Sequence, residues 1–85
     1  MCTYLTKRVE VAGSGLGADG WFPLRTAVVY FDHPQDAPVE HALCVDFRGD
    51  GLARVAVELD ARSARALAET ILETLDSEEA RALSG

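Results

Sequence analysis

The amino-acid sequence predicts an α+β fold, in which a four-stranded antiparallel β-meander carries one C-terminal amphipathic helix packed on one face. Three observations predict it. Apolar residues alternate with a period of two over residues 3–11, 41–48 and 52–59, residues 24–32 are apolar on both sides, and from Asp60 the apolar spacing becomes that of a helix. Because 85 residues suffice for one small core, we expect a single domain spanning residues 1–85.

The first expected strand spans residues 3–11. Leu5, Val9 and Val11 fall on one side of its alternation, and Lys7 falls on the same side. A charged side chain on the inward side is typical of an edge strand, whose margin stays in contact with water. We therefore expect this strand to lie at an edge of the sheet.

Residues 12–23 contain four glycines, which leave the backbone so free that we expect a long glycine-rich loop. Trp21 and Phe22 are expected to anchor the far end of this loop over the sheet. Phosphate binding is disfavoured, because no helix follows these glycines. The main interpretation is a flexible or lid-like connection.

Three further strands are expected at residues 24–32, 41–48 and 52–59. Alternation sets their register, because a slip of one residue would move every side chain to the other face. The expected cross-strand pairs between the second and third strands are Ala27 with Phe47, Val29 with Val45, and Phe31 with Leu43.

This register has two consequences. It brings His33 opposite His41 at the mouth of the hairpin, on the face that carries the core. Between the third and fourth strands, a short turn at residues 49–51 would place Phe47 opposite Ala53. The pairs Val45 with Val55, Leu43 with Val57 and the oppositely charged Asp46 with Arg54 would follow from the same turn.

The C-terminal segment is predicted to form a helix over residues 61–75, with Asp60 as its N-cap. A second short helical turn is expected to begin at Ser77. Six residues of the main helix form an apolar stripe, which we expect to lie on the inner face of the sheet: Ala64, Leu67, Ala68, Ile71, Leu72 and Leu75.

One helix covers one face of the sheet only. The other, outer face would then carry Val28, Tyr30, Cys44 and Ala56 in contact with water. Such a patch predicts a homodimer formed sheet to sheet, or a protein partner. The alternative is that the aromatic residues at the end of the glycine-rich loop fold back over this face.

Composition narrows the class of partner. A net charge of −6 with scattered Lys and Arg residues argues against nucleic acid and anionic membranes. No apolar run is long enough to span a membrane, and the first residues lack the pattern of a signal peptide. We therefore expect a cytoplasmic protein in which Cys2 and Cys44 remain thiols.

His33, His41 and Cys2 are the candidate metal ligands. Two neighbouring imidazoles could share zinc, nickel or copper, and if Met1 is removed the amine and thiolate of Cys2 could complete the site. Strand parity places Cys2 on the opposite face from His33, which weakens its candidacy. The alternative is that both histidines only border a loop, since their spacing matches no known zinc motif.

Several motifs carry a resemblance that covers most of the chain: MCTYLTKRVEV, GSGLGADGWFPL, VYFDHP, EHAL and ARVAVELDARSARAL. Together they resemble a small family of uncharacterised actinobacterial proteins of unknown function. The resemblance implies no activity, substrate or catalytic residue.

Three hypotheses of function follow. The first is a small cytosolic, self-associating binding protein that holds a divalent transition metal near His33 and His41. The second is a metal-free interaction module that binds a protein through the outer sheet face. The third is a small enzyme with a pocket under the glycine-rich loop, for which the sequence offers no complete catalytic set.

Overall fold

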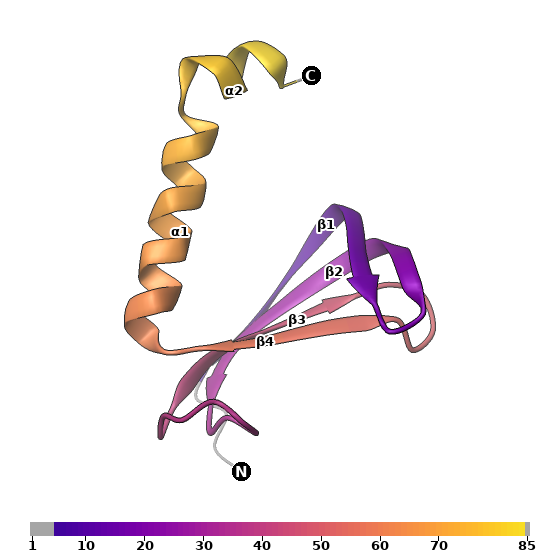
Figure 1. Cartoon of the computed structure of the whole chain (residues 1–85), viewed down its shortest axis with the longest axis vertical. Coiled ribbons are helices and arrows are strands. Elements are labelled where there is room, and N and C mark those ends of the chain that lie inside the picture. The colour runs from indigo at the N-terminus through magenta and orange to yellow at the C-terminus, as the bar shows by residue number, and fades with distance from the viewer. Residues whose placement is uncertain (1–4, 85) are drawn as a thin grey trace.

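The computed structural model describes residues 5–84 and confirms the α+β class (Figure 1). Four antiparallel strands form one sheet in the order β1-β2-β3-β4, which places β1 at an edge as expected. The elements are β1 (Leu5–Gly17), β2 (Gly20–Asp32), β3 (Ala42–Arg48), β4 (Arg54–Leu59), α1 (Ala61–Leu75) and α2 (Glu78–Leu83).

The expected glycine-rich loop over residues 12–23 is wrong. β1 and β2 instead run together to a two-residue turn before Gly20, whose φ of 108° suits glycine, with a bulge between Glu10 and Gly13. The glycines of this hairpin make room for large side chains. A Cβ on Gly17 would come within 3.0 Å of Phe22. The lid interpretation therefore fails, and the Trp21 side chain is 71% exposed rather than anchored.

The register between β2 and β3 is confirmed for all three predicted pairs. The register between β3 and β4 is wrong by two residues, because Phe47 lies opposite Val55 rather than Ala53. The connection is longer than predicted: Gly49 N–H donates to the Ala53 carbonyl at 3.0 Å, which closes a five-residue turn. Gly51 adopts a φ of 63° within it.

Helix α1 has the predicted bounds and the predicted N-cap. The Asp60 carboxylate accepts a hydrogen bond from the Ser63 N–H at 2.7 Å, and this bond lowers the pKa of Asp60. The predicted second turn is α2, where the Ser77 hydroxyl accepts from the Ala80 N–H at 3.1 Å. Both helix starts could thus be read from their capping residues.

The placement of α1 differs from the expectation. The helix leaves the end of β4 and rises away from the sheet instead of lying across its inner face (Figure 1). No residue of α1 is buried, and the four largest side chains of its apolar stripe, Leu67, Ile71, Leu72 and Leu75, are 50% to 60% exposed. The physical reason lies in the connection. Asp60 alone joins β4 to α1, and one connecting residue leaves little length for the chain to turn back over the sheet.

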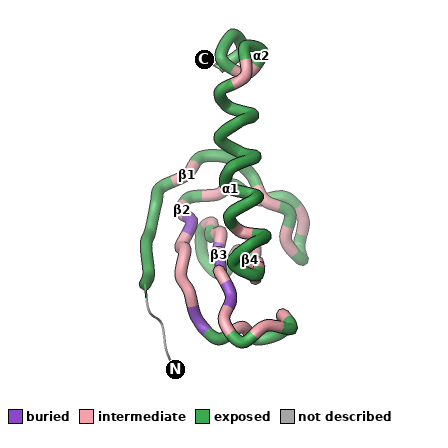
Figure 2. Tube along the Cα trace, turned by 90° about the vertical axis from the view of Figure 1, so that its left-hand side faces the viewer, coloured by how far each residue is buried: buried purple, intermediate pink, exposed green. Residues whose placement is uncertain are grey.

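The interior is small as a result. Among the described residues, the buried hydrophobic side chains are only Ala27, Ala42 and Cys44, which lie on β2 and β3 (Figure 2). The radius of gyration is 14.4 Å, against about 12 Å for a compact chain of this length. The chain exposes 6719 Å², whereas a compact monomer of 9.1 kDa exposes about 4,900 Å². Roughly 1,800 Å² of surface is thus exposed in excess.

Candidate binding surfaces

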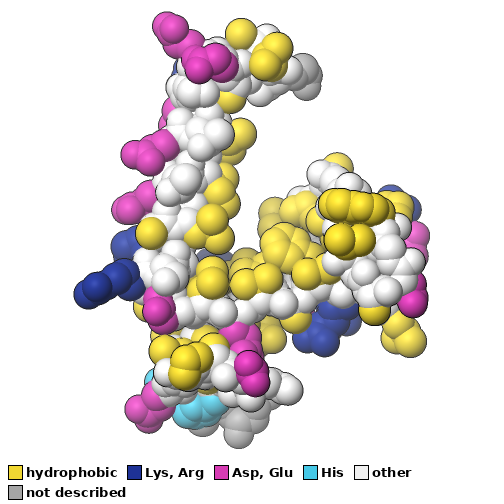
Figure 3. Space-filling view, in the orientation of Figure 1, with side chains coloured by type: hydrophobic (Ala, Val, Ile, Leu, Met, Phe, Trp, Pro, Cys, Tyr) yellow, Lys and Arg dark blue, Asp and Glu magenta, His cyan; other side chains and the backbone are white. Residues whose placement is uncertain are grey.

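Part of the exposed apolar surface lies where α1 faces the inner side of the sheet. Apolar side chains line both walls of this angle (Figure 3). They enclose an open groove of about 730 Å³, here called the α1 groove. Its sheet wall includes Val29, Phe31, Leu43, Val45 and Leu59, and its helix wall is the apolar stripe without Leu75. Each wall forms because apolar side chains recur on one face, every second residue along the strands and about every 3.6 residues along the helix.

Charges border the α1 groove on its helix side. Arg65 and Glu69 line it beside the apolar stripe. The first turn of α1 carries no acidic residue and its last turn no basic residue. Apart from the Asp60 cap, the two end turns therefore lack the charges that stabilise an isolated helix through its macrodipole.

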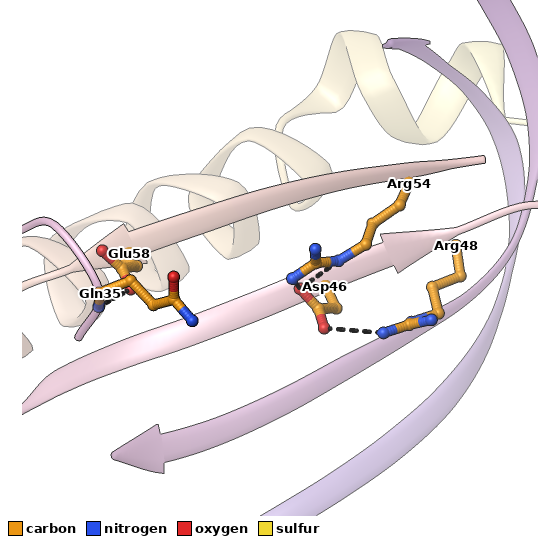
Figure 4. A network of polar contacts seen from close by, with 5 residues as sticks. All are labelled: Gln35, Asp46, Arg48, Arg54 and Glu58. Carbon is orange, nitrogen blue, oxygen red and sulfur yellow. Dashed lines mark hydrogen bonds and ion pairs between the residues drawn. The ribbon is translucent and has the colours of Figure 1, made fainter. Parts of the chain in front are cut away.

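The outer face of the sheet is covered by groups of the same chain. Asp46 is 7% exposed and accepts hydrogen bonds from two arginines (Figure 4). Arg54 Nη2 lies 2.9 Å and Arg48 Nη2 3.3 Å from its carboxylate oxygens. The attraction between Asp46 and Arg54 was predicted, but it acts diagonally across the strands, because Asp46 lies opposite Ala56.

A second cover on the outer face is the loop between β2 and β3. The Glu58 carboxylate on β4 accepts three backbone N–H bonds from this loop: from Gln35 at 2.6 Å, and from Asp36 and Ala37 at 3.0 Å each. These bonds lower the pKa of Glu58. Sequence reasoning missed this contact, because nothing near Glu58 in the chain indicates that it binds a loop 21 to 23 residues away.

The predicted outer patch is therefore less open than the sequence indicates. Tyr30 and Cys44 are cross-strand neighbours as predicted, but Cys44 is 3% exposed and Tyr30 is half-buried. Burial, and then the Glu58 charge, raise the pKa of the Cys44 thiol, which suits a packed side chain better than a nucleophile. A depression of about 490 Å³ beside them is bordered by the polar side chains of Thr6 and Asp32.

The two histidines are brought together as predicted. Their ring centroids lie 4.6 Å apart, tilted by 32°. His33 Nδ1 lies 3.0 Å from the Glu40 carbonyl oxygen, which can only accept, so Nδ1 is the donor and Nε2 is directed elsewhere. The His41 ring stacks on Phe31 at 6.0 Å.

The third predicted metal ligand is not part of this arrangement. Cys2 lies outside the described residues. Within residues 5–84, no group of three His, Cys, Asp or Glu side chains is placed to hold a metal ion. The histidine pair is thus a partial ligand set.

A family model matches residues 1–84, which is nearly the whole chain. The chain belongs to DUF6295, a family of unknown function. Membership confirms the resemblance seen in the sequence motifs. No curated protein and no solved structure matched the DUF6295 chain. Within residues 5–84, neither helix has the length and apolar character needed to cross a membrane.

Proposed function

We propose that this chain is a small cytosolic binding protein that self-associates, and that it does so through the α1 groove. The observation that supports the proposal most is the roughly 1,800 Å² of excess surface. If each of two copies buried that surface, the interface would total about 3,600 Å², within the range of obligate homodimers. The α1 groove thus takes the role that was expected of the outer sheet face.

Stability supports the same proposal. A monomer whose described hydrophobic core consists of two alanines and a cysteine gains little from burial. The leucines and isoleucine of α1 would each contribute about 1.5–3 kcal/mol if buried fully. Association would therefore supply the core that one copy lacks.

The test is the mass in solution of three proteins, measured by light scattering after gel filtration. The unaltered chain is expected to be a dimer. Ile71→Glu places a charge in the apolar stripe and is expected to give a monomer. Ala66→Glu adds the same charge on an exposed part of the same helix outside the groove, and should leave the dimer intact. A monomeric unaltered chain at all concentrations would overturn the proposal.

A second candidate function is binding of a divalent transition metal by His33 and His41. It is favoured by the 4.6 Å separation of the two rings and by the backbone partner that orients His33. Cys2, or the same pair from another copy, would supply the remaining ligands.

Metal content of untagged protein tests this candidate. Near-stoichiometric zinc, nickel or copper is expected, falling to background when both histidines are replaced by alanine. The control is Cys2→Ser, which should weaken metal binding only if Cys2 is a ligand. Protein that is metal-free as purified and whose stability ignores added metal contradicts the hypothesis.

A further inference from the structure

We propose that the α1 groove is occupied by α1 of a second copy, lying antiparallel to the first about a two-fold axis near the middle of the helix. This inference rests on the self-association proposed above and adds how the two copies meet.

The connection between β4 and α1 explains why a second copy, rather than the chain's own helix, fills the groove. Only Asp60 separates the two elements, and it is held by two bonds: its carboxylate accepts from Ser63 N–H at 2.7 Å and its carbonyl from Ala64 N–H at 2.9 Å. Both bonds hold Asp60 to the start of α1, and this single connecting residue leaves little length to reverse the chain and lay α1 across its own sheet. An antiparallel partner helix instead runs back toward the sheet without any change in this connection.

The apolar stripe is complementary to itself in this orientation. Reversing the helix about a point between Glu69 and Thr70 superimposes the stripe positions on one another. Small residues then meet large ones in two of the three kinds of contact, which lets the helices approach closely. The contacts are Ala64 with Leu75, Ala68 with Ile71, and Leu67 with Leu72 of the other copy.

The charges toward the two ends of α1 favour the same orientation, whereas the two Glu69 side chains of the groove lining meet near the axis. Arg65 lines the groove in the first half of α1, and Asp76 is the C-cap on the same flank. An antiparallel partner brings Asp76 of the second copy beside Arg65 of the first, and the reverse. It also places the negative C-terminal end of each helix beside the positive N-terminal end of the other, which offsets the unfavourable charge distribution of the single helix.

Disulfide trapping tests the orientation. In a Cys2→Ser, Cys44→Ala background, Ala64→Cys and Leu75→Cys variants are made separately, then mixed and oxidised. The antiparallel pair places residue 64 opposite residue 75 of the other copy, so the mixture should form a cross-linked heterodimer. Each variant alone should not cross-link. In the antiparallel pair, residue 64 of one copy lies 11 residues along the helix axis from residue 64 of the other, which is about 16 Å and beyond the reach of a disulfide.

Cross-linking of Ala64→Cys with itself would overturn the proposal in favour of a parallel pair. A dimer by mass that gives no cross-link in any combination would overturn the antiparallel arrangement and leave the proposed function standing. A monomer by mass would overturn both the antiparallel arrangement and the proposed self-association.

A charge reversal gives an independent measurement that needs no disulfide. Arg65→Glu is expected to raise the dimer dissociation constant on the order of tenfold. The reason is that residue 65 of each copy faces Asp76 of the other, so each dimer loses two such contacts. Arg62→Glu is the matched control: the same charge change in the same helix, at a residue outside the groove lining. Equal dissociation constants for the two variants would contradict the proposed contact.

Discussion

The two faces of the sheet are built by alternate residues of the same strands, yet one is covered by its own chain and the other is not. The outer face is covered in two places: Asp46 binds two arginines, and Glu58 holds a loop. The inner face lines the α1 groove and is left open there. A face that the chain covers with polar contacts needs no partner, whereas an apolar face left open does.

The largest effect is expected from a charge placed in the α1 groove, against the inner face. Ile71→Glu should destabilise the folded state by about 2–4 kcal/mol per copy, because a side chain buried in the dimer is replaced by a charge. Thermal unfolding at several protein concentrations measures it. The midpoint of the unaltered chain should rise with concentration, and that of the variant should not. A concentration-independent midpoint in both proteins would count against the open inner face as an interface.

The next effect tests the packing of the β1–β2 hairpin against Gly49. A Cβ there would lie 2.6 Å from both the Phe22 ring and the Pro23 carbonyl oxygen, and the backbone oxygen cannot move aside easily. Gly49→Ala is expected to cost about 2 kcal/mol in urea unfolding. Gly13→Ala is the control, because a Cβ at Gly13 meets nothing within 4 Å. Equal stabilities would show that Phe22 and Pro23 do not pack closely against Gly49.

A smaller effect is expected at Asp46. Asp46→Ala removes the acceptor of two arginines that are themselves about half exposed, so the expected loss is about 1–2 kcal/mol in the free energy of unfolding. Asp46→Asn keeps one oxygen acceptor and should lose less. The dimer should survive both changes, since Asp46 lies on the face away from the α1 groove. Dissociation of the dimer in either variant would contradict the proposal that only the inner face forms the interface.

The smallest effect concerns pH. Because the loop N–H bonds lower the Glu58 pKa below its ordinary 4.5, they stabilise the fold above that pH. This contribution is lost as pH falls through the lowered pKa. Amide hydrogen exchange of Gln35, Asp36 and Ala37 should therefore show protection at pH 6 that weakens at acid pH. In Glu58→Ala the protection should be absent at both values, and protection that persists there would refute the contact.

The local pattern of the sequence sufficed for much of the fold. Asp60 and Ser77 indicate the starts of the helices, and alternation around Val29 and Val45 gives the β2–β3 register and hence the histidine pair. These features depend on neighbours in the chain or on strict periodicity.

Other features depend on contacts between distant residues, which one sequence does not reveal. Gly17 reads as a flexible position until Phe22 is seen beside it. The turn after Arg48 could close over three residues or five, and only the hydrogen bond from Gly49 to Ala53 decides. The direction of α1 follows from a single-residue connection rather than from the apolar stripe, so the groove could not be foreseen.

Sedimentation equilibrium of the untagged chain tests the central claim most directly, because it reports mass without a column or a label. If the inner face is closed by a second copy, the fitted mass is twice 9.1 kDa at micromolar concentration. A mass of 9.1 kDa throughout the concentration range would contradict the account.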